Sequence, residues 1–359
     1  MKQSDTKIRT FEDIVLEHSV RYPELCARDL FKLLYQYAFG CEHMVSDERT
    51  VCDRIEAERE AITDGTPSEV EELGDYCRVG LSYLDYGLSA QTLGRLFYLS
   101  AARDECGEAK LAKGIEIISE LVSDGRLPVS QDEFSAALYE WENAKFPPVR
   151  HSEKYREIYS PSYRVIAKRY AAILPLLARI DTMLKAGDVR LAIDGGSASG
   201  KSTLARMLAE IYGCTLFHMD DFFLTPNMRT KARLAEAGGN VDRERFLVEV
   251  LTPLSRGEEI VYRRYDCSTG EIMPPEVRKP TRLTVTEGAY SMHPELASFY
   301  NLSVFLEVTP ELQRERILKR NSPEMAERHF SVWIPMEERY FDAFGIRERC
   351  DIRLYAKEI

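Results

Sequence analysis

One glycine-rich segment has the residue types and spacing that bind phosphate groups. Residues 195–202, Gly-Gly-Ser-Ala-Ser-Gly-Lys-Ser, fit the pattern G-x-x-x-x-G-K-[ST]. Glycines let backbone N–H groups converge on phosphate oxygens, the lysine reaches the β- and γ-phosphates, and the serine hydroxyl binds Mg²⁺. We therefore expect ATP and Mg²⁺ as cofactors, bound through Gly195, Gly196, Ser197, Ala198, Ser199, Gly200, Lys201, Ser202 and Thr203.

Two consecutive aspartates help to identify the phosphate acceptor. The loop alone does not show whether the phosphate goes to water, to a protein or to a metabolite. Asp220 and Asp221 follow a short β-rich run, so they should lie at the carboxyl edge of a sheet, where ligands bind in open α/β folds. A carboxylate there can accept the proton of an acceptor hydroxyl. The alternative is that one aspartate caps a following helix, and the residues do not decide which is the base.

An acidic residue and a basic helix complete the candidate site. Glu287 ends a predicted strand, where it can hold magnesium directly or through water, although a solvated strand end is the alternative. Arginines near a phosphate site can clamp the transferring group. The helix after Thr309-Pro310 offers several, of which Arg316 and Arg320 share a face. A solvated face paired with neighbouring glutamates is the competing interpretation of this helix.

The C-terminal half has the elements needed to position these residues. Short β-rich runs alternate there with helical patterns, which predicts a parallel sheet flanked by helices. We expect strands at 189–193, 215–219, 282–287, 302–308 and 351–355, and helices from Lys201, at 243–254 and at 311–320. The predicted fold is an α/β P-loop domain at 188–359, with a lid, preceded by an all-α domain at 1–185.

The first 185 residues show helical spacing of apolar residues, with breaks at Gly- and Pro-containing turns. We expect roughly seven to nine helices there. Cys41 and His43 lie close together but lack a second pair at metal spacing, so we do not expect zinc. Residues 146–155 gather basic side chains after Pro147-Pro148, which either bind a phosphate or form a solvated linker. The residues do not rank regulation, dimerisation and substrate recruitment as the role of this domain.

Composition excludes several classes of function. A chain of 359 residues suits two domains. The net charge of −11 offers no basic field for nucleic acid. The eight cysteines form no CxxC pair, and no apolar run is long enough to span a membrane. We expect a cytoplasmic protein whose partner is a small hydroxyl-bearing molecule, without nucleic acid or membrane, and homo-oligomers stay open.

The C-terminal half resembles the uridine kinase group of P-loop kinases, which includes nicotinamide riboside kinases, phosphoribulokinases and bacterial pantothenate kinases. The resemblance covers about residues 188–359 and rests on segments in the group's order: Gly-Gly-Ser-Ala-Ser-Gly-Lys-Ser at 195–202, Asp-Asp-Phe-Phe at 220–223, Tyr265-Asp266, Glu287-Gly288 and the region Arg316 to Arg320. Cys267 and the residues after it replace the histidine expected for pyrimidine recognition, and uridine kinases ordinarily lack the long N-terminal part.

The resemblance implies a role for each matching residue. Asp220, Lys201, Arg316 and Arg320 would be catalytic, Asp220 as the base and the two arginines in the lid. Ser202 and Glu287 would hold magnesium, and Asp221, Tyr265 and Asp266 would contact the acceptor. Arg264, beside Tyr265, can recognise an anionic acceptor, although a polar hairpin edge also accounts for it.

The resulting hypothesis is an ATP-dependent kinase that phosphorylates a hydroxyl of a small metabolite, with a nucleoside as the leading acceptor. Nicotinamide riboside, pantothenate and sugar phosphates are alternative acceptors. A second hypothesis is a nucleotide-dependent switch or ATPase that controls the N-terminal domain, and a third gives that domain a catalytic role of its own.

Overall fold

A computed structural model describes residues 9–41, 48–60, 70–101 and 106–357. The chain divides into two compact units, Met1–Leu174 and Pro175–Ile359. The division precedes the change in sequence texture near 186–188, because the helix α8 (Leu174–Ala186) belongs with the second unit. No helix in the described ranges combines the length and apolarity needed to span a membrane.

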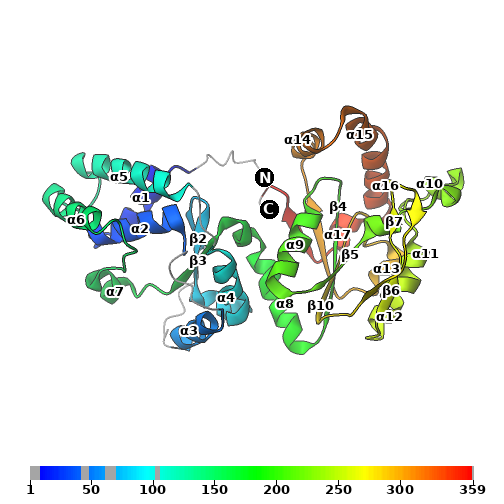
Figure 1. Ribbon diagram of the computed structural model, residues 1–359, viewed down its shortest axis with the longest axis horizontal. Coiled ribbons are helices and arrows are strands. Elements are labelled where there is room, and N and C mark those ends of the chain that lie inside the picture. Colours follow the sequence, from blue (N-terminus) through cyan, green and yellow to red (C-terminus); the bar gives the residue numbers. More distant parts are fainter. Residues whose placement is uncertain (1–8, 42–47, 61–69, 102–105, 358–359) are drawn as a thin grey trace. The chain divides into compact units, whose positions relative to one another are not determined.

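The N-terminal unit is mainly helical, as predicted, and it also contains a small sheet that the sequence analysis did not predict (Figure 1). Its helices are α1 (Phe11–Arg21), α2 (Ala27–Phe39), α3 (Glu48–Glu60), α4 (Ala90–Leu99), α5 (Gly107–Ser123), α6 (Gln131–Asn143) and α7 (Glu153–Tyr159). Strands β1 (Val70–Leu73), β2 (Tyr76–Gly80) and β3 (Tyr163–Ala167) pair antiparallel in the order β1-β2-β3. The description of this unit as all-α is therefore corrected to helices around a three-stranded sheet.

The C-terminal unit contains the predicted parallel sheet with flanking helices (Figure 1). The strand order is β12-β11-β4-β10-β5 and every pairing is parallel. The strands are β4 (Val189–Gly195), β5 (Thr215–His218), β10 (Leu283–Glu287), β11 (Leu302–Glu307) and β12 (Ile352–Tyr355). All five predicted strands are present, to within a residue or two at their ends. Central β10 is buried along its whole length, as expected of a parallel sheet covered on both faces.

Helices and short ribbons surround this sheet. The helices that bear on the site are α9 (Lys201–Tyr212), α14 (Pro310–Arg320), α15 (Pro323–Arg328) and α16 (Ile334–Phe344). The predicted helix at 243–254 consists of α11 (Arg243–Phe246), a π-helical turn and α12 (Thr252–Ser255). Outside the main sheet, β6 (Ile260–Tyr262) pairs with β9 (Glu276–Arg278), and β7 (Tyr265–Asp266) with β8 (Glu271–Ile272).

The strand register brings the predicted site residues to one edge. Glu287 is opposite Ile193 of β4 on one side and His218 of β5 on the other. The glycine-rich loop follows β4, and Asp220 follows β5 by two residues. Because all three strands are parallel, the loop, Asp220 and Glu287 meet at the carboxyl edge of the sheet.

Candidate active site

The loop between β4 and α9 has the geometry of a phosphate cradle. Gly195 has φ 146°, and a Cβ there would lie 2.6 Å from the carbonyl oxygen of Leu306, so only glycine fits. Gly200 has φ 104° and directly precedes the first helical residue of α9. Lys201 Nζ donates to the carbonyl oxygens of Gly195 and Gly196, at 2.8 Å each. The lysine ammonium and the N-terminus of a twelve-residue helix are thus at one place, which favours a polyphosphate.

Two side chains outside the loop hold it in shape, and neither contact was predicted from the sequence. Glu337 of α16 is buried and accepts hydrogen bonds from Ser197 N at 2.8 Å and Ser197 Oγ at 2.7 Å. Asp194 accepts from Gly195 N at 2.7 Å and from Tyr340 Oη at 2.8 Å. Burial raises the pKa of both carboxyl groups, and these hydrogen bonds oppose the shift.

Ser202 and Glu287 form a pair of oxygen donors suited to magnesium. Ser202 Oγ donates to Glu287 Oε1 at 3.0 Å, and His218 Nδ1 lies 2.6 Å from the same oxygen. Burial alone would raise the pKa of Glu287, but the His218 contact and the charge of Lys201 lower it overall, so the carboxylate is ionised. An ionised carboxylate and a hydroxyl beside the phosphate loop are the ligands that Mg²⁺ prefers, and the residues present therefore fit this ion. His218 is a contact that the sequence analysis did not single out.

A cavity of about 930 Å³ connects the loop with the acceptor side. Asp220 lines this cavity together with Lys201, Ser202 and Glu287. The surrounding protein raises the pKa of Asp220 by desolvation, and the charge of Lys201 opposes this, although the carboxylate stays exposed to the cavity. One cavity is therefore lined both by the glycine-rich loop and by a carboxylate, the two kinds of group that phosphoryl transfer uses.

The predicted acceptor contacts are distributed unevenly. Tyr265 lines the cavity, and its hydroxyl accepts from Arg229 Nη2 at 3.2 Å. Asp221, Asp266 and Arg264 are not among the described residues that line it. Asp266 accepts from Ser268 N and Oγ within its own turn, and Arg264 is paired with Glu276 at 2.5 Å on an exposed edge.

The two predicted lid arginines have different surroundings. Arg316 Nη1 donates to the carbonyl oxygens of Ala198 at 3.2 Å and Ser199 at 3.4 Å, and its Nη2 donates to Ala356 O at 2.7 Å. Arg320, one turn further along α14, lines the cavity and its charge acts on Asp220. Both arginines line the cavity, but Arg316 is held against the loop by its hydrogen bonds, whereas Arg320 has no described hydrogen-bond partner.

Several other lining residues were not predicted. The polar and aromatic ones are Arg206, Arg229, Asn240, Tyr290, His329 and Trp333, which come from segments with no recognisable motif. Lys319 and Arg328 also line the cavity, and they belong to the predicted basic helix α14 and its continuation into α15. No local pattern distinguishes these positions from ordinary surface residues, because only the fold brings them to the cavity.

Comparison with known proteins shows what part of this unit is similar to. Residues 191–332 match the Phosphoribulokinase / Uridine kinase family. A phosphoribulokinase from Synechocystis sp. is 28% identical over 148 residues, covering 39% of this chain and 43% of that protein. The chain therefore spans less than half the length of this curated relative.

Solved structures of kinases also match this part of the chain at low identity. A possible uridine kinase from Bacillus stearothermophilus matches with 21% identity and a TM-score of 0.38, over 50% of this chain and 98% of that one. The shikimate kinase of Aquifex aeolicus matches with 20% identity and a TM-score of 0.24, over 47% and 86%. The C-terminal unit thus has an α/β P-loop kinase fold, and its residues 191–332 are similar to the Phosphoribulokinase / Uridine kinase family.

Proposed function

We propose that the C-terminal unit transfers the γ-phosphate of ATP to a hydroxyl group of a small metabolite. The observation that carries this proposal is that one cavity is lined by Lys201 and Ser202 of the loop and also by Asp220 and Tyr265. A nucleotide-dependent switch needs the loop but has no use for a carboxylate and an aromatic residue in the same cavity. The arrangement therefore favours transfer to a bound acceptor over hydrolysis.

In the proposed reaction, the acceptor oxygen forms a bond to the γ-phosphorus while the bond to the β-phosphate oxygen breaks and ADP leaves. Asp220 orients the acceptor hydroxyl and takes its proton. The raised pKa of Asp220 makes it a stronger base than an exposed aspartate. Magnesium held by Ser202 and Glu287 would offset the negative charge of the phosphates.

The basic residues stabilise the transferring group. Lys201 moves from the carbonyl oxygens of Gly195 and Gly196 to the phosphate oxygens, and the first N–H groups of α9 donate to the same group. Arg320 on the lid side adds positive charge near Asp220. Catalysis then consists mainly of positioning and charge neutralisation.

We propose a nucleoside as the first acceptor to test, with uridine as the leading compound. Nicotinamide riboside, pantothenate and sugar phosphates form the rest of the panel, because the family model does not fix the acceptor. ADP release with MgATP is measured for the full chain against each compound. We expect one class of acceptor to raise the rate well above the background without acceptor.

The matched pair Asp220→Asn and Asp221→Asn tests the mechanism. Losing a general base costs about 10²–10⁴-fold, so Asp220→Asn should remove acceptor-dependent ADP release while Asp221→Asn retains most of it. The opposite result would assign the base to Asp221. If no acceptor raises the rate and Asp220→Asn leaves the background unchanged, the switch becomes the better account.

A further inference from the structure

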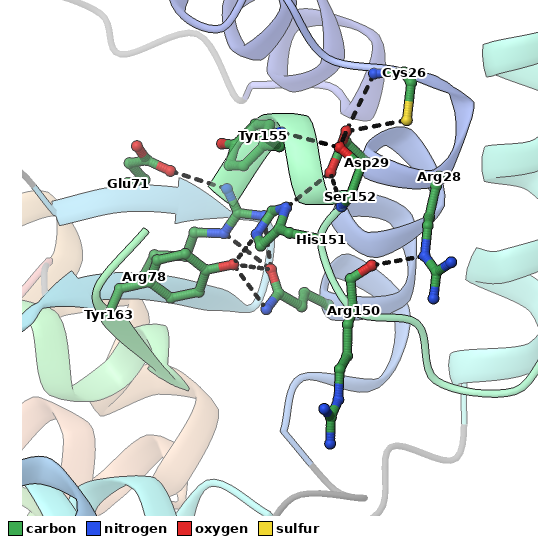
Figure 2. A network of polar contacts seen from close by, with 11 residues as sticks. Cys26, Arg28, Asp29, Glu71, Arg78, Arg150, His151, Ser152, Tyr155 and Tyr163 are labelled. Atoms are coloured by element: carbon green, nitrogen blue, oxygen red, sulfur yellow. Dashed lines mark hydrogen bonds and ion pairs between the residues drawn. The ribbon is translucent and has the colours of Figure 1, made fainter. Parts of the chain in front are cut away.

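The N-terminal unit contains a buried polar cluster, which we define as Asp29, Lys32, Gln36, Arg78, His151 and Tyr163. Its members come from α2, β2, β3 and the segment before α7. Figure 2 shows the polar ends of Arg78, His151 and Tyr163 pointing toward one another between the sheet and α2. His151 is 8% exposed, so the basic segment at 146–155 is not a solvated linker at this residue.

One side of the cluster is fixed by a hydrogen-bonded chain. Asp29 accepts from Ser152 N at 2.9 Å, Ser152 Oγ at 2.7 Å and Cys26 N at 3.1 Å, and His151 Nδ1 lies 3.1 Å from its Oδ1 (Figure 2). Burial raises the pKa of Asp29, but these hydrogen bonds lower it overall, and the carboxylate is ionised. His151 therefore donates through Nδ1 and accepts through Nε2 from the Tyr163 hydroxyl, at 2.7 Å.

The other side is fixed by Arg78, which is 2% exposed. Its Nε and Nη2 donate to Gln36 Oε1 at 2.9 and 2.7 Å, and its Nη1 donates to Glu71 at 3.2 Å. The guanidinium also lies over the ring of Tyr163, 4.7 Å from its centroid. The charge of Arg78 is thus matched by Glu71, and its orientation is set by several contacts.

Lys32 differs from the other members of the cluster because no described residue pairs with its charged group. Arg28, Lys32 and Gln36 follow one another at four-residue spacing on α2 and so share a face. Arg28 Nε holds the carbonyl oxygen of residue 150 at 3.0 Å, and Gln36 holds Arg78. Lys32, between them, is 6% exposed, yet no described residue accepts a hydrogen bond from its ammonium or pairs with it as a carboxylate. Lysine is rarely so deeply buried without a carboxylate partner, so its position calls for an explanation.

Lys32 lies in positively charged surroundings. Burial and the positive charges of Arg78 and Arg150 lower the pKa of Lys32 to about 8. Burial lowers the pKa of His151, and the charges of Arg78 and Lys32 act in the same direction. The guanidinium of Arg150 has no described carboxylate partner either. Lys32 and Arg150 therefore supply two positive charges without a described carboxylate partner, beside the hydrogen-bonded chain of Asp29 and His151.

We propose that Lys32 and Arg150 bind the phosphate group of a small metabolite in the N-terminal unit, beside the fixed groups of the cluster. Two unmatched positive charges suit a phosphate dianion better than a carboxylate. The hydrogen bonds of Asp29, Arg78 and Tyr163 hold the surrounding groups in place, as the supporting residues of a binding site do. This site is separate from the loop at 195–202 and does not depend on the proposed kinase reaction.

The test is a titration of the full chain with inorganic phosphate, followed by ³¹P NMR. Wild type is compared with Lys32→Met, and with Lys113→Met as the matched control, because Lys113 is an exposed lysine of the same unit paired with Glu116. Phosphate bound at the loop of residues 195–202 is common to all three proteins. We expect one saturable component in wild type and in Lys113→Met that is at least tenfold weaker in Lys32→Met.

Two further measurements guard against misfolding. Arg150→Gln changes an exposed residue and should weaken the same component several-fold. Without phosphate, Lys32→Met should melt at a higher temperature than wild type, because it removes an unpaired buried charge. Equal phosphate binding in wild type and Lys32→Met, or competition by acetate as strong as by phosphate, would overturn the proposal.

Discussion

Ser202 Oγ and Glu287 Oε1 lie 3.0 Å apart, which ties the first turn of α9 to the carboxyl end of β10. The two residues are 85 positions apart in the chain, and the parallel pairing of β10 with β4 brings them together. A single hydrogen bond therefore joins the two residues that we propose as magnesium ligands. Substitution of Ser202 with Glu287 left in place tests whether the two residues bind magnesium.

Ser202→Ala should lower kcat/KM for MgATP by about 10²-fold, because it removes one oxygen ligand near the developing charge. Raising the magnesium concentration should recover part of the loss, since the remaining ligand Glu287 is ionised. Steady-state kinetics over a range of magnesium concentrations measures this effect. Ser255→Ala, an exposed serine that bonds only to Thr252 O, is the control. A loss that does not depend on magnesium would argue against a metal role for Ser202.

Arg316 and Arg320 should differ in which kinetic constant they affect. Arg316 holds the carbonyl oxygens of Ala198 and Ser199, so Arg316→Ala should raise KM for ATP about tenfold by loosening the loop. Arg316→Lys should restore little, because one ammonium cannot reproduce the fork of contacts. Arg320→Ala should lower kcat about 10–10²-fold with a smaller change in KM, since Arg320 faces the cavity near Asp220. Equal effects of both alanine variants on kcat and KM would contradict this separation.

The sheet and the phosphate loop could be predicted because their signals are local. Short β-rich runs alternate with helices in the C-terminal half, and the loop pattern stands between a strand and a helix. The strands of the N-terminal unit are not marked by comparable β-rich runs in the sequence. Strand β1 carries Glu71 and Glu72 in four residues, and β2 pairs with β3 across more than 80 positions, so non-local pairing decides both.

The parts of the site that were missed share a physical cause. Glu337 contacts Ser197 from a helix 140 residues further along the chain, and no motif near Glu337 indicates the contact. His218 lies within the predicted strand 215–219 and was not singled out, because its link to Glu287 depends on the register of β5 and β10. In the sequence, Lys32 has the pattern of a polar position on an amphipathic helix. Its burial becomes visible only when α2 is packed in the folded unit.

Gly288 should not tolerate a side chain. Its φ is 142°, and a Cβ would lie 2.6 Å from the Cβ of Met219, the residue before Asp220. Gly288→Ala should therefore push apart the ends of β10 and β5, lowering the free energy of unfolding by about 2–4 kcal/mol and reducing kinase activity. Urea unfolding compared with Gly187→Ala, where a Cβ meets nothing within 4 Å, measures this. Similar stabilities for the two variants would show that the strand ends can move to admit a methyl group.

Acidification should destabilise the N-terminal unit, and His18 should account for part of the effect. Burial, followed by the positive charge of Arg78, lowers the pKa of His18 well below its usual value, and its Nε2 is buried without a described partner. Below pH 6.5 the unfolded chain binds a proton that the folded unit does not, so stability falls as the pH falls from 7 to 5. The pKa of His151 is lowered in the same direction, whereas the lowered pKa of Asp29 costs stability only at more acidic pH.

His18→Phe should reduce the stability lost between pH 7 and pH 5 by up to about 2 kcal/mol, which is the limit for one histidine over that interval. Urea unfolding followed by the fluorescence of the buried Trp141, in a Trp333→Phe background, reports on the N-terminal unit. His329→Phe in the C-terminal unit serves as the control and should leave the pH dependence of that signal unchanged. An identical pH dependence in wild type and His18→Phe would mean that His18 takes up its proton without unfolding the unit.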